Sequence, residues 1–342
     1  MNFTKEELKN IFQEISTPIE PKILEILGRD IDERSKEIVN YQILTGGKRL
    51  RPILAILSCL VMGKSAEHAI APAAGIEIIH NYSLMIDDII DNSVLRRKKP
   101  TTWFKYGKSI AQCIAVHYSA AVPQAANLSN NPALISEIFS KAMKVSADGE
   151  ILDILFEQRG REDEPYVVKN RFLNINADNY IDMIKKKAAF LFQASTEVGG
   201  ISAKASEPDL KELRDYGYNL GVAFQIKDDI LDIFGKEETF GKEIGKDIIE
   251  RKMGNIVLLF TLKDLSPIDK VKFLRILREE RRQTQDFQEV LELIQRAQSY
   301  QKAKLLGEKY ILKAKESLVK LPQNKWNKVL SDIADMAMER EK

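Results

Sequence analysis

The stretch Asp-Asp-Ile-Ile-Asp at residues 87–91 recurs as Asp-Asp-Ile-Leu-Asp at residues 228–232, 141 positions later. Each copy lies in an apolar, helix-compatible run. On a helix with about 3.6 residues per turn, the three carboxylates of one copy fall within one face. Like charges on one face repel, so a positive partner must offset them. Two such faces turned toward each other would form a cage of oxygen ligands suited to Mg²⁺ held together with phosphate groups.

The length and composition are those of a globular protein. The 342 residues suffice for one large domain or two ordinary ones, and 44% hydrophobic with 30% charged residues argues against disorder. The net charge of +2 is small, but basic residues cluster at 48–51, 96–99 and 185–187. Concentrated basic and acidic spots in a nearly neutral chain suggest a site for polyanions and metal, not a nucleic-acid stripe.

No feature of the chain suggests secretion or a membrane. Its two cysteines, Cys59 and Cys113, lie in apolar helical surroundings and form neither a disulfide framework nor a zinc motif. The first residues lack the charged and apolar regions of a signal peptide, and no apolar run approaches the length of a transmembrane helix. We therefore expect no membrane span and a cytoplasmic location.

Helical periodicity dominates the chain and predicts a single all-α domain over residues 1–342. One helix should begin near Pro52 and a long one should cover residues 66–91. Further helices are expected over residues 108–127, 132–158, 177–199, 207–234, 246–263, 267–281, 284–297, 299–319 and 323–341. We find no alternating strand and no hairpin dipeptide. The polar residues 157–176 should form an exposed loop.

Two basic segments flank the first acidic cluster. Residues 46–52 (Gly-Gly-Lys-Arg-Leu-Arg-Pro) combine a flexible turn with three cations, which can donate charge-assisted hydrogen bonds to phosphate oxygens. Residues 96–101 follow the first cluster by a few positions. Cations this close to a carboxylate cage make sense if both hold one magnesium diphosphate. A solvated basic turn, or a surface for membrane or nucleic acid, is the simpler alternative.

Together these blocks resemble the signature motifs of the trans-isoprenyl diphosphate synthases. The resemblance rests on residues 46–52, 87–101, 224–232 and 241–247, followed by Lys252, and covers nearly the whole chain. It implies an isoprenoid synthase-type helical bundle around a deep central apolar pocket, usually as a homodimer. It also implies a transferase that joins an allylic diphosphate to isopentenyl diphosphate, with no nucleic-acid partner.

The resemblance also assigns roles to individual residues. Three Mg²⁺ ions would be held by Asp87, Asp91 and Asp228, with support from Asp88, Asp229 and Asp232. The allylic diphosphate would be bound by Arg96, Lys187 and Lys242, and isopentenyl diphosphate by Lys48, Arg51, His80 and Arg97. Gln225 would face the developing allylic cation, and Lys252 would back the phosphate site. The expected catalytic set is Asp87, Asp88, Asp91, Asp228, Lys187 and Gln225.

The chemistry fits this inventory. Breaking the C–O bond places negative charge on the leaving diphosphate, which metal ions and fixed cations stabilise. The diphosphate can then accept the proton that leaves, so no protein base is required. The chain has three histidines and no recognisable catalytic triad. His80 lies about two helical turns before Asp87, although a satisfied core histidine would have the same position.

Product length should depend on the depth of the pocket below the first cluster, because one helical turn of about 5.4 Å is close to one extended five-carbon unit. Tyr82, five residues before Asp87, could block the floor beside the small Ser83. The resemblance then implies the twenty-carbon geranylgeranyl diphosphate. A tyrosine that only packs in the core is the alternative.

Three departures from the family pattern concern product length. Val116 and His117 replace the usual Gly-Asp, which should put an imidazole near the pocket wall and the dimer surface. Ala188 stands where threonine is common, and Lys98 replaces a usual glycine. No metal ligand or diphosphate cation is lost.

Other functions remain open at this point. A farnesyl or longer-chain synthase would differ only in pocket depth. A terpene cyclase would need no second diphosphate site, yet residues 46–52 and Arg97 are intact. A non-catalytic subunit of a heteromeric synthase would be expected to lose acidic ligands, yet both clusters are complete.

Overall fold

The computed structural model of the protein describes residues 2–235, 246–249, 252–278 and 284–339. These residues are almost entirely helical, which confirms the predicted all-α class. The elements up to the end of the eighth α-helix are α1 (Lys5–Ser16), α2 (Ile19–Leu27), α3 (Glu33–Leu44), α4 (Leu50–Val61), α5 (Glu67–Ile90), β1 (Leu95–Arg96), β2 (Lys99–Pro100), α6 (Thr102–Tyr106), α7 (Lys108–Asn127) and α8 (Pro132–Leu155). The later elements are α9 (Pro165–Asn170), α10 (Ala177–Ile184), η1 (Lys185–Ala189), α11 (Phe190–Ser202), α12 (Glu207–Phe234), α14 (Lys246–Ile249), α15 (Ile256–Asp264), α16 (Pro267–Arg278), α17 (Thr284–Arg296), α18 (Ser299–Val319) and α19 (Lys325–Glu339).

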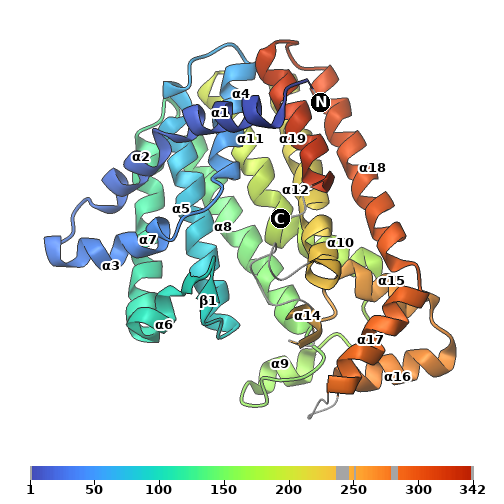
Figure 1. Ribbon diagram of the computed structural model, residues 1–342. Coiled ribbons are helices and arrows are strands. Elements are labelled where there is room, and N and C mark those ends of the chain that lie inside the picture. The colour runs from blue at the N-terminus through green and yellow to red at the C-terminus, as the bar shows by residue number, and fades with distance from the viewer. Residues whose placement is uncertain (1, 236–245, 250–251, 279–283, 340–342) are drawn as a thin grey trace.

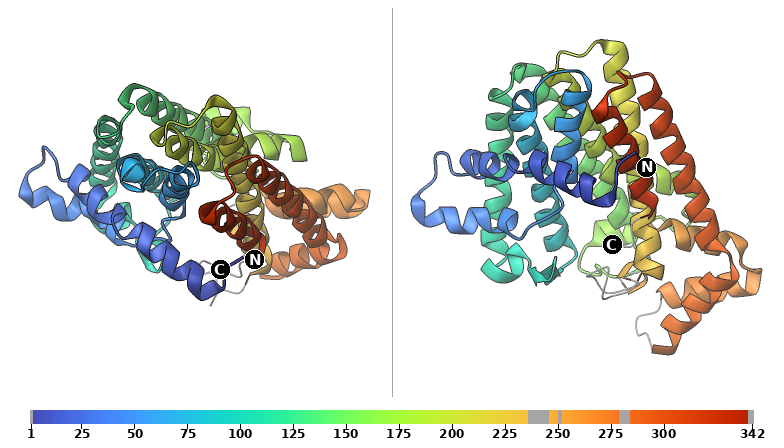
Figure 2. Two further views of the ribbon diagram at one scale, coloured as in Figure 1. Left: turned by 90° about the horizontal axis from the view of Figure 1, so that it is seen from above. Right: turned by 45° about the horizontal axis from the view of Figure 1, so that its top comes forward.

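The long helices form a bundle whose centre is α11. This helix packs against α4, α5, α8 and α12, while α18 runs beside α12 (Figure 1). The left view of Figure 2 shows the bundle from above, along several of these helices. Much of α5 is buried because apolar residues occur on several of its faces, which is typical of a helix enclosed by neighbours. The central helices therefore carry the acidic clusters on rigid, fully packed supports.

A second apolar cluster lies at one end of the bundle, where α15, α16 and α17 pack together (Figure 1). It includes the fully buried Phe273 and Val257, together with residues of α10 and α12. This cluster fixes the second half of α12, where the second acidic cluster lies. No helix among the described residues is long and apolar enough to cross a bilayer.

Local signals explain where α12 begins. Ser206 is the N-cap, and its side-chain oxygen accepts a hydrogen bond from the backbone N–H of Asp209 at 3.4 Å. Pro208 lies in the first turn, where its missing N–H costs nothing. The helix then runs for 28 residues to Phe234. The predicted bounds of 207–234 are confirmed, as are those of 108–127 and 299–319.

The N-terminal residues are tied to α19 by one carboxylate. Asp332, which is completely buried, accepts hydrogen bonds from the backbone N–H groups of Asn2 at 2.7 Å and Phe3 at 2.8 Å. The Asn2 side-chain amide donates to the same group at 3.0 Å. These bonds satisfy a buried charge with three donors from the far end of the sequence.

Two predicted helices are wrong in their continuity. The helix expected over 246–263 divides into α14 and α15, because Asn255 caps a new helix by accepting the N–H of Val257 at 2.9 Å. The helix expected over 177–199 is interrupted at Lys185–Ala189 by a wider π-helical turn, η1, and continues to Ser202. Periodicity alone does not signal either feature.

The expectation of no strand is wrong for the basic segment after the first acidic cluster, which forms a short hairpin. Leu95 pairs with Pro100 and Arg96 with Lys99, and the turn between them uses Arg97 at φ 53° and Lys98 at φ 62°. Positive φ angles at both central residues are typical of two-residue hairpin turns. The absence of a glycine concealed this signal. Residues 157–176 are only partly an exposed loop, because Glu157 and Gln158 are buried and α9 lies within them.

Candidate functional site

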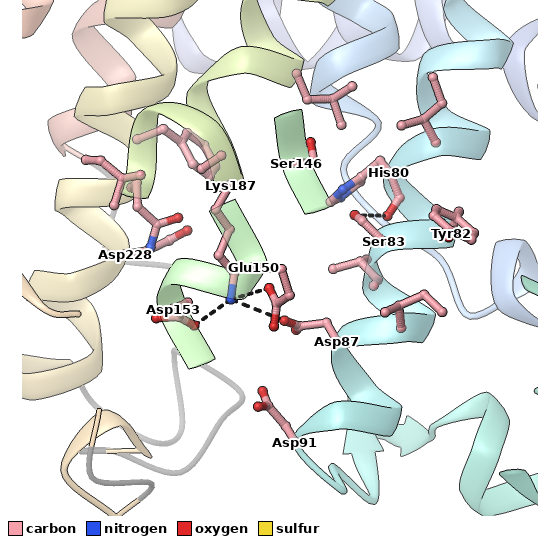
Figure 3. A pocket seen from close by; sticks show the side chains of 18 of the residues that line it. His80, Tyr82, Ser83, Asp87, Asp91, Ser146, Glu150, Asp153, Lys187 and Asp228 are labelled. Atoms are coloured by element: carbon pink, nitrogen blue, oxygen red, sulfur yellow. Dashed lines mark hydrogen bonds and ion pairs between the residues drawn. The ribbon is translucent and has the colours of Figure 1, made fainter. Parts of the chain in front are cut away.

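A cavity of about 960 Å³ lies between α5, α8, α12 and the turn that precedes α4. Figure 3 shows Asp87 and Asp91 of α5 on one side and Asp228 of α12 on the other. Apolar residues of α5 and α8, among them Ile86 and Ile154, line the space between them. The two acidic clusters, 141 residues apart in the sequence, therefore open onto the same cavity.

The first cluster is neutralised by Arg96, which reaches back from β1. The Arg96 guanidinium lies 2.8 Å from an Asp88 oxygen and 3.0 Å from an Asp87 oxygen. Asp88 is buried and turned toward this arginine, whereas Asp87 lines the cavity. Asp91, at the end of α5, accepts from Lys252 Nζ at 3.0 Å. Arg96 of the hairpin and Lys252 thus supply the positive charge beside the three carboxylates at this helix end.

Lys187 lies at the centre of the cavity and contacts three carboxylates (Figure 3). Its Nζ is 2.6 Å from Asp153 Oδ2, 2.8 Å from Glu150 Oε2 and 3.4 Å from Asp87 Oδ1. Burial alone would lower the pKa of Lys187, but the charges of Asp153, Glu150 and Asp87 outweigh it and raise that pKa well above its usual value. The lysine is therefore a permanent cation in this cavity.

Glu150 and Asp153 of α8 are functional candidates that sequence reasoning missed. Burial raises the pKa of Glu150 to about 7, although Lys187 acts in the opposite direction. For Asp153, burial is outweighed by Lys187 and Lys252, which hold its pKa below the usual value. The available signal was their spacing of three residues, which places two acids on one face of a helix that lines the same cavity with mostly apolar residues.

The aspartates of the second cluster, residues 228–232, differ in their surroundings. Asp228 lines the cavity. Asp229 is buried, and its two oxygens accept hydrogen bonds from Gln225 Nε2 at 3.0 Å and from the backbone N–H of Ile256 at 2.9 Å. Burial, followed by the nearby charge of Asp247, raises the pKa of Asp229 well above its usual value. Asp229 therefore joins α12 to the start of α15, and it also belongs to the cavity lining.

Asp232 and Asp247 extend this region toward α14. Asp232 is buried and accepts from the backbone N–H of Asp247 at 3.2 Å, while Asp247 accepts from Asn255 at 2.8 Å. Gln225, whose amide is bonded to Asp229, also lines the cavity. Lys242, predicted to bind the allylic diphosphate, lies outside the described residues.

A second group of polar side chains, three cations and one histidine, lines the same cavity on the side of α4. Lys48, Arg51, His80 and Arg97 all belong to this lining. Arg51 Nη1 lies 3.2 Å from His80 Nε2, and its guanidinium carbon is 4.4 Å from the centre of the Phe192 ring. Arg97 donates to the carbonyl of Gly46, which joins the hairpin to the glycine turn. Burial, together with Arg51 and Arg97, lowers the pKa of His80 well below its usual value and keeps the imidazole neutral.

Arg49, within the same basic turn, has a structural role. It is buried and donates to Glu77 Oε1 at 2.8 Å, to Glu20 Oε2 at 2.9 Å and to the carbonyl of Ile43 at 2.8 Å. Its φ of 52° turns the chain sharply just before α4. All three cations of residues 46–52 belong to the cavity lining, but Arg49 is also anchored internally by Glu20 and Glu77.

The predicted chain-length residues line the cavity, while the departures on α7 do not. Tyr82 and Ser83 both belong to the lining, and the Ser83 hydroxyl donates to the carbonyl of His80 at 2.8 Å. The prediction that His117 lies near the pocket wall is wrong, because its Nε2 lies 2.8 Å from the carbonyl oxygen of Leu27 in α2. Val116 is largely exposed on α7. His117 instead joins two helices outside the cavity.

The donor set suits Mg²⁺ bound together with a substrate. Among the described residues, no group of three or more acidic, histidine or cysteine side chains closes around one metal position. The cavity instead offers carboxylates from α5 and α12 that face each other (Figure 3). Mg²⁺ commonly takes one or two carboxylates and completes its shell with water and substrate phosphates, so this arrangement fits.

Comparisons with known proteins agree with this geometry. The profile of the polyprenyl synthetase family matches residues 32–294. A geranylgeranyl diphosphate synthase from Saccharolobus solfataricus is 33% identical over 348 residues, covering 99% of this chain and 100% of the relative. A polyprenyl synthase from Caulobacter crescentus, solved with calcium and isoprenyl diphosphate, has a TM-score of 0.88 at 29% identity, covering 100% of this chain and 99% of that one.

A decaprenyl diphosphate synthase from Rhodobacter capsulatus is as similar in structure. Its TM-score is 0.87 at 29% identity, with 98% of this chain and 99% of that chain covered. The isoprenoid synthase-type fold is thereby confirmed. Among these proteins, the Caulobacter crescentus structure contains calcium and isoprenyl diphosphate, and the names of the relatives give products of different length. The chain belongs to the polyprenyl synthetase family of trans-prenyltransferases and is an isoprenyl diphosphate synthase family enzyme.

Proposed function

We propose that this enzyme joins isopentenyl diphosphate to allylic diphosphates and releases mainly geranylgeranyl diphosphate. One observation carries the proposal: two cation groups and two facing carboxylate clusters line a single cavity. Such a cavity can hold two diphosphates with their hydrocarbon parts against its apolar walls. The similarity to a geranylgeranyl diphosphate synthase supports the twenty-carbon product.

The proposed metal ligands are Asp87, Asp91 and Asp228, for three Mg²⁺ ions. Asp88, Asp229 and Asp232 support them from buried positions, since each is bonded to a neighbouring element. When bound, Mg²⁺ would stabilise the negative charge that grows on the leaving diphosphate. Lys252, bonded to Asp91, keeps that carboxylate in place behind the phosphate site.

The cations on each side of the cavity would bind one substrate each. Arg96 and Lys187, together with Lys242, hold the allylic diphosphate, because both described members already contact the first cluster. Lys48, Arg51, His80 and Arg97 hold isopentenyl diphosphate. The neutral His80 and the charged Arg51, which lie in contact, would both offer hydrogen bonds to this second diphosphate.

The protein mainly orients the two substrates, and the reaction itself needs few further protein groups. The allylic C–O bond breaks and its electron pair leaves with the diphosphate. The alkene of isopentenyl diphosphate attacks the cation to form the new C–C bond. A proton leaves the adjacent carbon and is accepted by the departed diphosphate, which restores a double bond. Gln225, held by Asp229, faces the cationic carbon with its amide oxygen, and the apolar walls exclude water.

A product assay tests this function. The protein is incubated with Mg²⁺, isopentenyl diphosphate and starters of five, ten or fifteen carbons, and the dephosphorylated products are separated by chromatography. Geranylgeraniol as the main product supports the proposal. Farnesol or longer alcohols would change the product assignment alone. Cyclic hydrocarbons from an allylic diphosphate without isopentenyl diphosphate would identify a terpene cyclase, and turnover only with a companion chain would identify a subunit of a heteromeric enzyme.

Tyr82 provides the sharpest test of product length. Tyr82→Ala removes an aromatic ring from the cavity lining about one and a half helical turns below Asp87, so products should gain one or more five-carbon units. Tyr82→Phe keeps the ring and should keep the product. Chromatography of the alcohols from both variants measures the change, and identical product profiles would remove the twenty-carbon assignment.

Assembly and location stay predictions. The homodimer implied by the family is tested by sedimentation of the purified protein. The cytoplasmic location is tested by fractionation of cells that express the untagged chain.

A further inference from the structure

We infer that two glycines on neighbouring helices, Gly149 of α8 and Gly221 of α12, position Lys187 by making room for the π-helical turn η1. The inference rests on the role proposed above for Lys187 at the allylic diphosphate. Gly149 and Gly221 touch no substrate in this proposal. They act on the reaction through the backbone that carries the lysine.

The turn itself differs from the helices on both sides. From Lys185 to Ala189 the backbone winds more widely, and the N–H of Phe190 donates to the carbonyl of Lys185 five residues earlier. Single π-helical turns are uncommon and are often found at functional sites. Here the wide turn carries Lys187, whose ammonium group lies among Asp87, Glu150 and Asp153.

Gly149 accommodates the turn on one side. A Cβ atom on Gly149 would lie 2.2 Å from the backbone nitrogen of Lys187, 2.6 Å from its Cα and 2.8 Å from the carbonyl carbon of Lys186. These neighbours are backbone atoms, which cannot rotate away as the end of a long side chain can. Any side chain at position 149 must therefore displace the segment that carries Lys187.

Gly221 accommodates the turn from α12. A Cβ atom there would lie 2.7 Å from the Cα of Ala189, 3.1 Å from its Cβ and 3.0 Å from the Cβ of Phe192. The turn packs against both α8 and α12. Added volume at position 221 would therefore push it toward α8, where Gly149 leaves no space to spare.

The residues on both sides of Gly149 form ion pairs with two lysines of the turn. Asp148 lies 3.0 Å from Lys186 Nζ, and Glu150 lies 2.8 Å from Lys187 Nζ. Lys186 is therefore held on the outer side while Lys187 points into the cavity (Figure 3). One three-residue segment of α8 supplies the space for the turn and a partner for each of the two lysines.

The test compares Gly149→Ala with Gly307→Ala. At Gly307 of α18, the nearest neighbours of an added Cβ would be the end of the Met338 side chain at 2.5 Å and Ile226 at 3.4 Å, neither of which belongs to the turn. Binding of a non-ionising allylic thiolodiphosphate is measured by calorimetry in the presence of Mg²⁺, and KM is measured for both substrates. A displacement near 1 Å can cost about a hundredfold, so Gly149→Ala should weaken allylic binding at least tenfold. Its KM for isopentenyl diphosphate and both constants of Gly307→Ala should stay unchanged.

A double-variant cycle separates positioning from general damage. If Gly149→Ala acts through Lys187, it should add little to the loss caused by Lys187→Ala, so the two effects on allylic binding should not add. Additive effects, or an equal weakening for both substrates, would overturn the inference. If Gly149→Ala does not fold, Gly221→Ala carries the same cycle, since its closest contacts are less severe.

The outcomes also separate this inference from the proposed function. Wild-type protein that elongates no allylic starter refutes the proposed function. Wild-type protein that elongates normally, together with Gly149→Ala and Gly221→Ala variants that bind the allylic analogue as tightly as the wild type, refutes only the positioning role.

Discussion

At the scale of single residues, Lys98 occupies a position that suits glycine. Its φ of 62° lies in the left-handed region, which costs a residue with a Cβ about 1–2 kcal/mol, while glycine loses about 0.5–1 kcal/mol through chain entropy. Lys98→Gly should therefore raise the free energy of unfolding by about 0.5–1 kcal/mol. Urea denaturation measures this, with Lys98→Ala as the control, which removes the charge and should bring no gain.

Glu150 predicts a pH dependence of stability. Burial raises its folded-state pKa from 4.5 to about 7. Between these values the unfolded state has lost a proton that the folded state still holds, so the free energy of unfolding falls as pH rises through this window. Glu150→Gln should remove this part of the slope. Urea denaturation between pH 5 and about 8 tests it, and the exposed change Glu137→Gln on the same helix should leave the slope in place.

Single residues also mark the limits of sequence reasoning about the site. Asp87, Asp91 and Asp228 were identified because a repeated acidic pattern in apolar surroundings needs a special explanation, and all three line the cavity. Glu150 and Asp153 were missed because two acids on an otherwise ordinary helix need none. Their significance lies in the approach of Lys187 from another helix, which no local pattern encodes.

At the scale of elements, Arg49 joins the turn before α4 to α2 and α5. Arg49→Met would leave the buried Glu77 without its charged partner, which costs about 3–5 kcal/mol in comparable cases. Adding Glu77→Gln should recover much of this loss, because a neutral amide is cheaper to bury. Urea denaturation of both variants measures the difference. Equal stabilities of the single and double variants would show that Glu77 finds another partner.

Elements differ in how well the sequence predicts them. The helices α7, α12 and α18 were predicted with their full bounds from long periodic runs, although only α12 among them begins at a capping side chain, Ser206. The hairpin of β1 and β2 was not, since Arg97 and Lys98 adopt positive φ angles without glycine or asparagine. The turn η1 was also missed. It depends on space left by Gly149 and Gly221, which are distant in the sequence.

At the scale of the whole molecule, ligand binding should couple both halves of the bundle. Because the cavity lies between α5 and α12, Mg²⁺ with inorganic diphosphate should raise the melting temperature. At a diphosphate concentration of a hundred times Kd, binding should add about 2.7 kcal/mol to the free energy of unfolding. Chelation of the metal should abolish the shift. Differential scanning fluorimetry measures it, and Asp228→Asn should reduce it although Asp228 is remote from the first cluster in sequence. A full shift in that variant would argue against a shared site.

The contact between the N-terminal residues and α19 has its own consequence. Asp332 is sheltered from water and depends on donors from Asn2 and Phe3. Removal of Asn2 and Phe3 would leave the buried Asp332 carboxylate without these donors, so α19 should detach or fray. The N-terminal residues and α19 thus hold each other in place, and removing the former is expected to make α19 susceptible to proteases.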